Sequence, residues 1–472
     1  MDNIKTDICV IGAGSGGLSF AAGAAQMGAS VVLFEKGKMG GDCLNYGCVP
    51  SKSLIESSKY ASIAYKAKNL GVQINNIQLD AKDIMNHIKN VIKKIEPHDS
   101  VERFESLGVK VIQSKASFID SKSVQGENCV VSAKYFIIST GSSPRIIPFN
   151  GLNLNRVLTN ENIFDLNYIP KILLVIGGGP IGCELAQAFA SFGTKIIILE
   201  NSDKILGMLD SSSRDILLDS WKNLPIDVFT SVTDINFSDS NSIRKVSFVT
   251  EKIKNEIIFD DILMATGREP NLSILNLDNA NIFFDSKGII VDAYQRTNQK
   301  RIFAIGDCAS RFQFTHNASY QASALIQTIL FKLPKKVSYN YFPYCIYTNP
   351  EIAHVGICVA DAKKQGLTIL SLKYEGNDRA IATANELGLI QVSTDKRGYI
   401  YGVTIIGANA GELITQWTIL MSNKKKLKHM ASTIVPYPTL SELNKRVAGS
   451  FYTPKLFSKK VQSIVKVLMK IF

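Results

Sequence analysis

The strongest limit on the fold is a supersecondary unit that occurs twice in the chain. Each copy has an apolar strand, a G-x-G-x-x-G turn, a helix and a second apolar strand that ends in glutamate. The turn glycines are Gly12, Gly14 and Gly17 in the first copy and Gly177, Gly179 and Gly182 in the second. The glutamates, Glu35 and Glu200, each stand 23 positions after the first glycine of their copy. This repeat predicts an α/β protein with two Rossmann-like dinucleotide-binding domains.

The three glycines suit a bound dinucleotide for separate physical reasons. The first makes a tight turn, the second lets a pyrophosphate approach the backbone, and the third lets the helix pack closely on the strand. The helix N-terminus supports the phosphates, and the glutamate is placed to accept a hydrogen bond from a ribose hydroxyl. Glu200 would repel a 2′-phosphate, and Lys204 is the only base close behind it. The second site is therefore predicted to prefer NAD over NADP.

A glycine-rich segment at 40–52 contains two cysteines five positions apart, Cys43 and Cys48. In a regular α-helix, Cα atoms with this spacing are about 8 Å apart, too far for a disulfide. If the two cysteines pair, the chain between them must be looped, which the glycines of the segment permit. Pro50 suits the first turn of a helix and would put Cys48 at its start, where a thiolate is stabilised. The segment predicts a redox disulfide with one stabilised thiolate, and the alternative is two unrelated buried cysteines.

The composition describes a soluble globular protein with two to four domains in its 472 residues. No apolar run is long enough to span a membrane, and the N-terminus enters a strand without a signal peptide. Eight cysteines without a dense spacing pattern are typical of a reducing cytoplasm. There is no Cys-x-x-Cys and no His/Cys cluster, so no metal site is expected. The net charge of +12 comes without a nucleic-acid motif, so nucleic acid is not an expected partner.

The cysteine segment resembles the active-site motif of the class I pyridine nucleotide-disulfide oxidoreductases, such as dihydrolipoamide dehydrogenase, glutathione reductase and mercuric reductase. The resemblance covers about residues 5–455. It implies a homodimer in which FAD binds the first dinucleotide fold and NAD(P)H the second. It also implies that Cys48 is the thiolate facing the flavin, and that Cys43 is the outer thiol that meets the acceptor.

Further positions match motifs of this family. Thr140 and Gly141 match the turn that closes the flavin domain, and Gly267 matches the corresponding turn of the nicotinamide domain. Asp307 matches the aspartate that binds the ribityl chain of FAD. The resemblance also implies a buried ion pair beside the flavin between Lys52 and Glu184.

The resemblance gives the expected domain organisation. A discontinuous FAD-binding domain comprises residues 1–147 and 272–337, and the NAD(P)-binding domain comprises residues 148–271. A C-terminal α+β dimerisation domain is expected at 338–453, followed by a tail at 454–472.

One position departs from the family pattern. Members that exchange dithiols carry His-Pro-Thr-x-x-Glu near the C-terminus, where the histidine acts as base for the partner subunit's thiol. This chain has Tyr437 at the position of that histidine and keeps the glutamate as Glu442. A histidine with a pKa of about 6.5 can exchange protons at neutral pH, whereas a tyrosine with a pKa of about 10 is largely protonated. Thiol–disulfide exchange through Cys43 is therefore expected to be slow.

These features predict an NAD(P)H-dependent flavoprotein disulfide oxidoreductase of uncertain acceptor. A soft metal ion, as in mercuric reductases, or a small quinone-like acceptor is favoured. An authentic dihydrolipoamide dehydrogenase is the alternative that Tyr437 disfavours. A non-catalytic flavoprotein that serves as scaffold or redox sensor is a second alternative.

The tail forms a candidate basic amphipathic helix. One helical face is apolar and comprises Phe457, Val461, Ile464, Val465, Leu468 and Phe472. The opposite face carries the lysines Lys459, Lys466 and Lys470. Such a helix can lie on an anionic membrane or pack on its own dimer. The expected location is cytoplasmic, with association at the membrane surface if the tail binds lipid.

Overall fold

The structure is a computed structural model, which describes residues 1–240, 243–310 and 312–471. The chain forms two compact units, and each consists of several segments of the sequence. The first comprises Met1–Ser57, Gln78–Gly177 and Val232–Ser338, and the second comprises Ser58–Ile77, Gly178–Ser231 and Tyr339–Phe472. Residues 241–242 and 311 of the first unit and Phe472 of the second lie outside the described part of the chain.

A seven-stranded sheet forms the centre of the first unit, in the order β3-β2-β1-β6-β5-β4, with β19 also paired to β6. Its strands are β1 (Asp2–Ile11), β2 (Val31–Glu35), β3 (Val109–Gln113), β4 (Ser117–Asp120), β5 (Ser123–Gln125), β6 (Cys129–Ile138) and β19 (Ile302–Ala304). Neighbours from β3 to β6 run parallel, and so do β6 and β19. The apolar run Ile8–Val10 of β1 is fully buried, as expected for a parallel strand covered on both faces.

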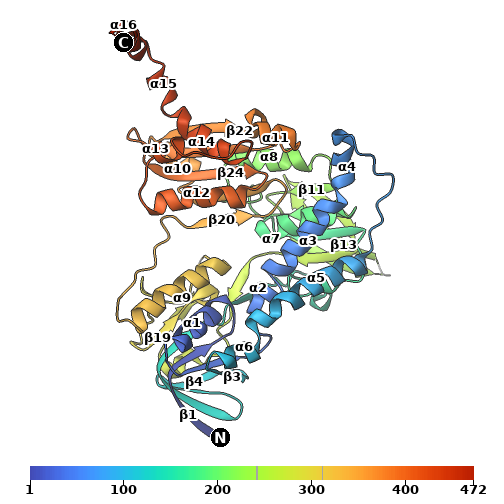
Figure 1. Ribbon diagram of the computed structural model, residues 1–472. Coiled ribbons are helices and arrows are strands. Elements are labelled where there is room, and N and C mark those ends of the chain that lie inside the picture. Colours follow the sequence, from blue (N-terminus) through green and yellow to red (C-terminus); the bar gives the residue numbers. More distant parts are fainter. Residues whose placement is uncertain (241–242, 311, 472) are drawn as a thin grey trace. The chain divides into compact units, whose positions relative to one another are not determined.

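Helix α1 (Ser15–Gln26) and helix α9 (Thr315–Ile329) lie side by side in this unit, as Figure 1 shows. Small residues of α1 allow this close approach. A methyl group on Gly16 would crowd Ala318 and Ile305, and one on Gly23 would crowd Ile326. The N-terminus of α9 lies near the cysteine segment. The hydroxyl of Thr315 is 3.2 Å from Cys48 Sγ.

The cysteine segment continues into helices that follow it in sequence. These are α2 (Gly41–Asn45), α3 (Cys48–Ala61), α4 (Ile63–Ala67), α5 (Ala81–Ile95) and α6 (Val101–Ser106). Asp80 caps α5 by accepting hydrogen bonds from the backbone N–H groups of Lys82 and Asp83. Ile88 of α5 is fully buried, which agrees with the apolar spacing of this helix.

The second glycine repeat contributes strands to both units. The first unit contains β8 (Val157–Leu158), β9 (Ile172–Ile176) and β15 (Asp261–Met264), with β15 parallel to both of the others. The second contains β10 (Lys195–Leu199) and β11 (Ile226–Phe229), which are parallel, and the helices α7 (Pro180–Ser191) and α8 (Ser211–Trp221). The first unit also has an antiparallel sheet of β12 (Thr233–Ser240), β13 (Ile243–Thr250) and β14 (Ile253–Phe259), and the pair β17 (Phe284–Asp285) and β18 (Gly288–Ile289).

The C-terminal part of the second unit is a five-stranded antiparallel sheet in the order β20-β21-β24-β23-β22. Its strands are β20 (Pro343–Ile346), β21 (Glu351–Gly356), β22 (Thr368–Lys373), β23 (Leu389–Thr394) and β24 (Ile400–Gly407). Its helices are α10 (Val359–Lys364), α11 (Asp378–Ala382), α12 (Ala410–Ser422), α13 (Leu427–Ala431) and α14 (Ser441–Ser450). Trp417 of α12 is fully buried, and its indole N–H donates to Asn444 of α14. The predicted α+β architecture of this region is confirmed.

Two short helices end the chain, α15 (Thr453–Leu456) and α16 (Lys459–Ile471). Across the described ranges, no helix combines the length and the apolar character needed to cross a membrane.

Candidate active site

The first glycine turn has a backbone that admits only glycine at critical points. Gly12 has φ of 105°, and a Cβ there would overlap the carbonyl of Ser139. A Cβ on Gly17 would overlap the carbonyl of Gly12, so this glycine allows helix and turn to pack closely. Gly14, the N-cap of α1, has no neighbour within 4 Å on its Cβ side. The helix start is thus open to a phosphate, as the motif requires.

The second turn repeats this geometry. Gly177 has φ of 107°, and a Cβ there would overlap the carbonyl of Ala265. Gly179 is the N-cap of α7 and again has no neighbour within 4 Å on its Cβ side, while Gly182 is buried within α7.

The two glutamates share a role that their sequence position did not reveal. Glu35 Oε2 accepts a hydrogen bond of 2.7 Å from the N–H of Ala13, inside the first glycine turn. Glu200 Oε2 accepts one of 2.7 Å from the N–H of Gly178, inside the second. Each carboxylate therefore fixes its turn through one oxygen. The predicted contact with a ribose hydroxyl remains a prediction.

The two Thr-Gly turns of the first unit pair with each other. The strands that follow them, β7 (Ser142–Pro144) and β16 (Arg268–Pro270), form a two-stranded antiparallel sheet. Thr140 donates its hydroxyl hydrogen to the carbonyl of Asn271 at 2.8 Å, and Gly141 and Gly267 both have positive φ. The pairing joins β7, which precedes the second glycine repeat in the sequence, to β16, which follows it.

The cysteine segment differs from the predicted loop in one respect. Cys43 lies in the short helix α2, and the break occurs afterwards, at Tyr46 and Gly47. The N–H groups of Tyr46 and Gly47 both donate to the carbonyl of Asp42, and a Cβ on Gly47 would crowd the Asp42 carboxylate. Helix α3 begins at Cys48, as predicted.

Cys43 and Cys48 are free thiols in this structure, and each is the other's hydrogen-bond partner. The hydrogen bond from Cys43 lowers the pKa of Cys48 to about 6, with further lowering by the Thr315 hydroxyl and Lys52. The same bond and partial burial raise the pKa of Cys43. Desolvation of Cys48 opposes this lowering, but the polar contacts outweigh it. The geometry describes one thiolate held by one thiol, and the disulfide form remains a prediction.

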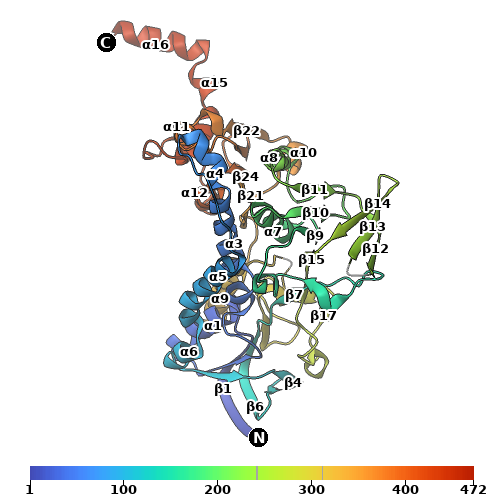
Figure 2. The same cartoon turned by 90° about the vertical axis from the view of Figure 1, so that its right-hand side faces the viewer.

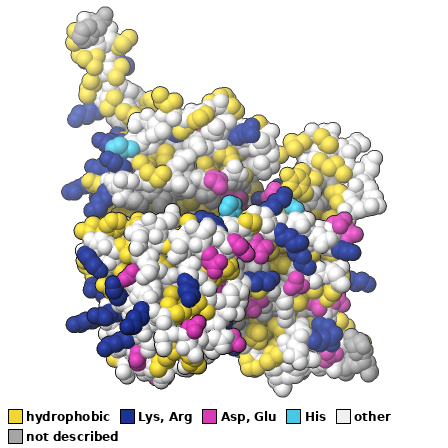
Figure 3. Space-filling model, turned by 60° about the horizontal axis from the view of Figure 1, so that its bottom comes forward, with side chains coloured by type: hydrophobic (Ala, Val, Ile, Leu, Met, Phe, Trp, Pro, Cys, Tyr) yellow, Lys and Arg dark blue, Asp and Glu magenta, His cyan; other side chains and the backbone are white. Residues whose placement is uncertain are grey.

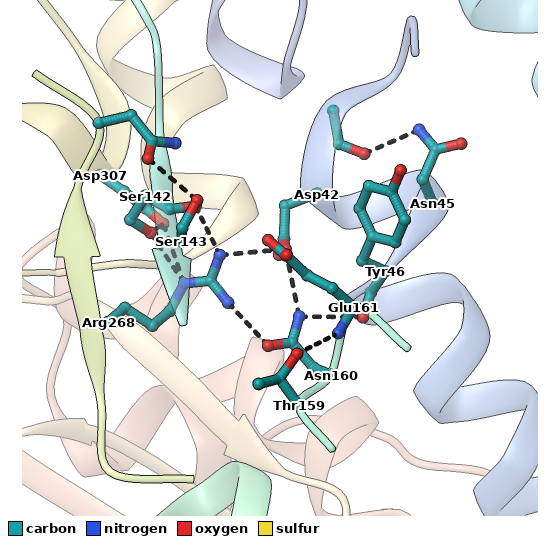
Figure 4. A network of polar contacts seen from close by, with 12 residues as sticks. Asp42, Asn45, Tyr46, Ser142, Ser143, Thr159, Asn160, Glu161, Arg268 and Asp307 are labelled. Carbon is teal, nitrogen blue, oxygen red and sulfur yellow. Dashed lines mark hydrogen bonds and ion pairs between the residues drawn. The ribbon is translucent and has the colours of Figure 1, made fainter. Parts of the chain in front are cut away.

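An ion-pair network, drawn in Figure 4, surrounds the residue before Cys43. Asp42 Oδ1 lies 3.0 Å from a guanidinium nitrogen of Arg268. Asn160 donates from its amide to Asp42 at 3.2 Å and to the carbonyl of Tyr46 at 3.1 Å, which holds both ends of the turn between the cysteines. The network fixes the shape of the cysteine segment from residues more than a hundred positions away.

Arg268 continues this network toward Asp307. Its Nε donates to the Ser142 hydroxyl at 2.8 Å, and that hydroxyl donates to Asp307 Oδ2 at 2.7 Å. Burial raises the pKa of Asp307, while the Ser142 hydrogen bond and the charge of Arg268 oppose this. The predicted flavin-binding aspartate and the residue before Cys43 are therefore joined through one guanidinium.

The other predicted catalytic residues lie on both units. Lys52 of α3 is half-buried and donates to Ser51 at 3.4 Å. Glu184 of α7 belongs to the second unit, is 6% exposed, and accepts from the N–H of Tyr347 at 2.8 Å. The ion pair between Lys52 and Glu184 stays a prediction.

Tyr437 lies in the segment between α13 and α14 and is 70% exposed. Its hydroxyl donates to Asp378 Oδ2 at 2.9 Å, and this bond raises the pKa of the phenol. Glu442 follows in the first turn of α14, and its charge raises this pKa further. Tyr437 is therefore a protonated hydrogen-bond donor at neutral pH and a poor base.

The sequence matches the family model described as pyridine nucleotide-disulphide oxidoreductase over residues 6–322. It matches that family's dimerisation domain over residues 342–448.

The chain belongs to the pyridine nucleotide-disulphide oxidoreductase family.

Relatives of this oxidoreductase carry different names. A dihydrolipoyl dehydrogenase of Geobacillus stearothermophilus is 33% identical over 449 residues, which cover 93% of this chain and 95% of the relative. A mercuric reductase of Staphylococcus aureus is 28% identical over 449 residues, covering 94% of this chain and 82% of the relative. The structure titled "Cu(II) complex of HOCl-induced flavoprotein disulfide reductase RclA from Escherichia coli" has a TM-score of 0.85 and 22% identity. It covers 94% of this chain and 99% of that one, and shows the fold alone.

Membership makes this oxidoreductase a class I flavoprotein enzyme that uses FAD and NAD(P)H, and the matched dimerisation domain indicates a homodimer. The residues of the structure fit two dinucleotides. Both glycine turns leave an open helix start, and Asp307 is a half-buried carboxylate beside the first of the Thr-Gly turns. When bound, FAD supplies the hydride chemistry, and the protein supplies binding and orientation.

Three residues of this oxidoreductase's site were missed in the sequence. Arg268 follows directly on the Gly267 turn and Asp42 precedes Cys43, so both stood inside recognised motifs without an assigned role. Thr315 contacts Cys48 from a position 267 residues away. No local pattern marks it.

Replacing Arg268 with glutamine is expected to lower the free energy of unfolding by about 2 kcal/mol, because Asp42 and the more buried Asp307 lose their shared cation. The Arg268 side chain is only 10% exposed. Urea unfolding followed by far-ultraviolet circular dichroism, which reports on the helices and strands of both units, would measure the change. Arg145→Gln, at an exposed position, is the matched control and is expected to change it by less than about 0.5 kcal/mol. Equal effects of the two variants would contradict a structural role of the network.

Proposed function

We propose that this oxidoreductase uses NADH to reduce the Cys43–Cys48 pair through FAD, and that the reduced pair delivers two electrons to a soft metal ion such as Hg(II). The balance is NADH plus the divalent ion giving NAD⁺, a proton and the neutral metal. Thiolate sulfur is the ligand that soft ions prefer. In the proposal, the thiolate of Cys48 and the sulfur of Cys43 are the two ligands of the metal ion.

The observation that favours a metal ion as the acceptor is that the phenol of Tyr437 is protonated and hydrogen-bonded. A dithiol substrate requires a base that takes a proton from the exchanging thiol near neutral pH. The O–H of Tyr437 already donates a hydrogen bond to Asp378, and that bond raises the pKa of the phenol. A metal ion bound by sulfur needs no such base, so the acceptor that suits this site is the metal rather than lipoamide or glutathione disulfide. A small quinone-like acceptor is the second candidate, because it too needs no thiol base.

The proposal places Tyr437 and Glu442 of one subunit beside the cysteine pair of the other, as the resemblance implies. The matched dimerisation domain supports this arrangement. It assigns Lys52 and Glu184 to a charge pair beside the flavin, and Asp307 to its ribityl chain.

NADH is the proposed electron donor. The carboxylate of Glu200 is held by Gly178 and by the N–H of Ser202, at 2.8 Å, at the end of β10. A fixed negative charge there disfavours a 2′-phosphate. Lys204, the nearby base, lies 3.8 Å from the carboxylate of Asp203, which offsets its charge.

An acceptor screen with the purified holoenzyme tests these assignments. NADH oxidation is expected with Hg(II), at a rate at least about 100-fold above that with lipoamide, and NADPH is expected to serve less well. Lipoamide turnover equal to that of histidine-containing members would identify a dihydrolipoamide dehydrogenase instead. FAD binding without NADH oxidation by any acceptor would identify a non-catalytic flavoprotein.

A further inference from the structure

The two last helices of the chain stand apart from the core of their own unit. Helix α14 leads into α15, and α16 then extends beyond it, away from the antiparallel sheet, as Figures 1 and 2 both show. Neither α15 nor α16 contains a buried residue. Phe472, which the sequence pattern placed on the apolar face, lies outside the described residues.

Helix α16 has two chemically distinct faces. Val461, Ile464, Val465, Leu468 and Ile471 recur at the spacing of one helical face. The larger of these side chains are exposed, with Leu468 at 49%, Ile464 at 50% and Ile471 at 66%. Met469, at the edge of that face, is 78% exposed. Figure 3 shows hydrophobic side chains along this projecting end of the chain.

The opposite face of α16 is basic. Lys459, Lys466 and Lys470 fall on it, and Lys455 and Lys460 add two more charges. The sequence has no Asp or Glu after Glu442, so no acid within the tail neutralises these five lysines. The tail thus combines an exposed apolar stripe with a dense positive charge.

We propose that this tail is a peripheral membrane anchor for anionic lipid, with α16 lying in the plane of the interface. The apolar stripe would enter the boundary between headgroups and acyl chains, and the lysines would contact the phosphates. The proposal concerns attachment and is independent of the electron acceptor.

Charge complementarity favours lipid over a second copy of the chain as the occupant of the apolar face. The whole chain carries a net charge of +12, so docking the lysine-rich tail on another copy brings like charges together. An anionic bilayer surface offers the opposite charge and an apolar layer at the depth that a helix lying in the interface needs. Both halves of the amphipathic pattern are then used.

Vesicle flotation of the full-length holoenzyme tests the proposal. The protein is expected to float with vesicles that contain phosphatidylglycerol, to bind phosphatidylcholine vesicles weakly, and to be partly released by high salt. The triple change of Lys459, Lys466 and Lys470 to glutamine is expected to weaken partitioning about 100-fold, at roughly five-fold per lysine. Ile464→Asp is expected to abolish it.

The matched control changes three exposed lysines elsewhere, Lys252, Lys254 and Lys287, to glutamine. It removes the same charge and is expected to leave binding within about two-fold. Equal loss in the control and the tail variant would overturn the proposal, as would failure of the wild type to float. So would a dimer that falls to monomer in the Ile464→Asp variant while the wild type does not bind vesicles, because the tail would then pack on a second copy. The flavin spectrum of each variant reports that it is folded.

Discussion

Cys48→Ser is expected to slow NADH oxidation by about 1,000-fold or more with every acceptor that takes two electrons from the reduced cysteine pair. The variant lacks the thiolate that forms and breaks the disulfide. Steady-state NADH oxidation with the best acceptor of the screen measures this. Cys358→Ser is the matched control, since Cys358 is a partly exposed thiol that donates to Asp361, and serine keeps a donor there. Unchanged turnover in Cys48→Ser would remove the cysteine pair from the mechanism.

The same residue gives a pH test that does not depend on turnover. The pKa of Cys48 is lowered to about 6, so its thiol is protonated and unreactive below that pH and a thiolate above it. Alkylation of the reduced enzyme by iodoacetamide is therefore expected to rise through a midpoint near pH 6. Cys43→Ala is expected to move this midpoint upward, because the hydrogen bond from Cys43 is the largest cause of the lowered pKa.

Cys43→Ser is the control for this measurement, since its hydroxyl can still donate to the Cys48 thiolate. It is expected to keep the midpoint within about one pH unit of the wild-type value. A Cys43→Ala midpoint equal to that of the wild type would assign the lowered pKa to the start of α3 instead.

Tyr437→His is expected to raise dihydrolipoamide turnover by about 100-fold to 1,000-fold at neutral pH. The imidazole has a pKa about three units below that of a phenol, and so provides a base that the wild type lacks. Asp378, which now accepts from the phenol at 2.9 Å, and Glu442 would both face the new imidazole and could orient it. Steady-state assays of NAD⁺ reduction by dihydrolipoamide measure the effect.

Tyr437→Phe is the matched control for this gain. It keeps the ring and removes the hydroxyl, so dihydrolipoamide turnover is expected to stay within about two-fold of the wild type. Equal gains in the two variants would mean that loss of the Asp378 bond, and not the new base, raises the rate. No gain in Tyr437→His would mean that position 437 does not reach the exchanging thiol.

Local sequence patterns predicted much of the fold. The strand, helix and second strand predicted for the second glycine repeat are present as β9, α7 and β10, and α3 begins at Cys48 as Pro50 suggested. These features succeed because glycine, proline and apolar spacing act on the backbone within a few residues. The loop expected between the cysteines was only partly right, since α2 carries Cys43 and the break comes at Tyr46 and Gly47.

The sequence by itself determined two dinucleotide folds, a cysteine pair at a helix start and a tyrosine in place of a base, because each is written in adjacent residues. Only the tertiary structure decided how the cysteine pair is held. Arg268 meets Asp42 from 226 positions away, and Thr315 reaches Cys48 from 267 positions away. Such contacts depend on how the sheet and helices bring distant segments together, and no local propensity encodes them. The hydrogen bond from Cys43 is the largest cause of the lowered pKa of Cys48, and the distant Thr315 hydroxyl lowers it further.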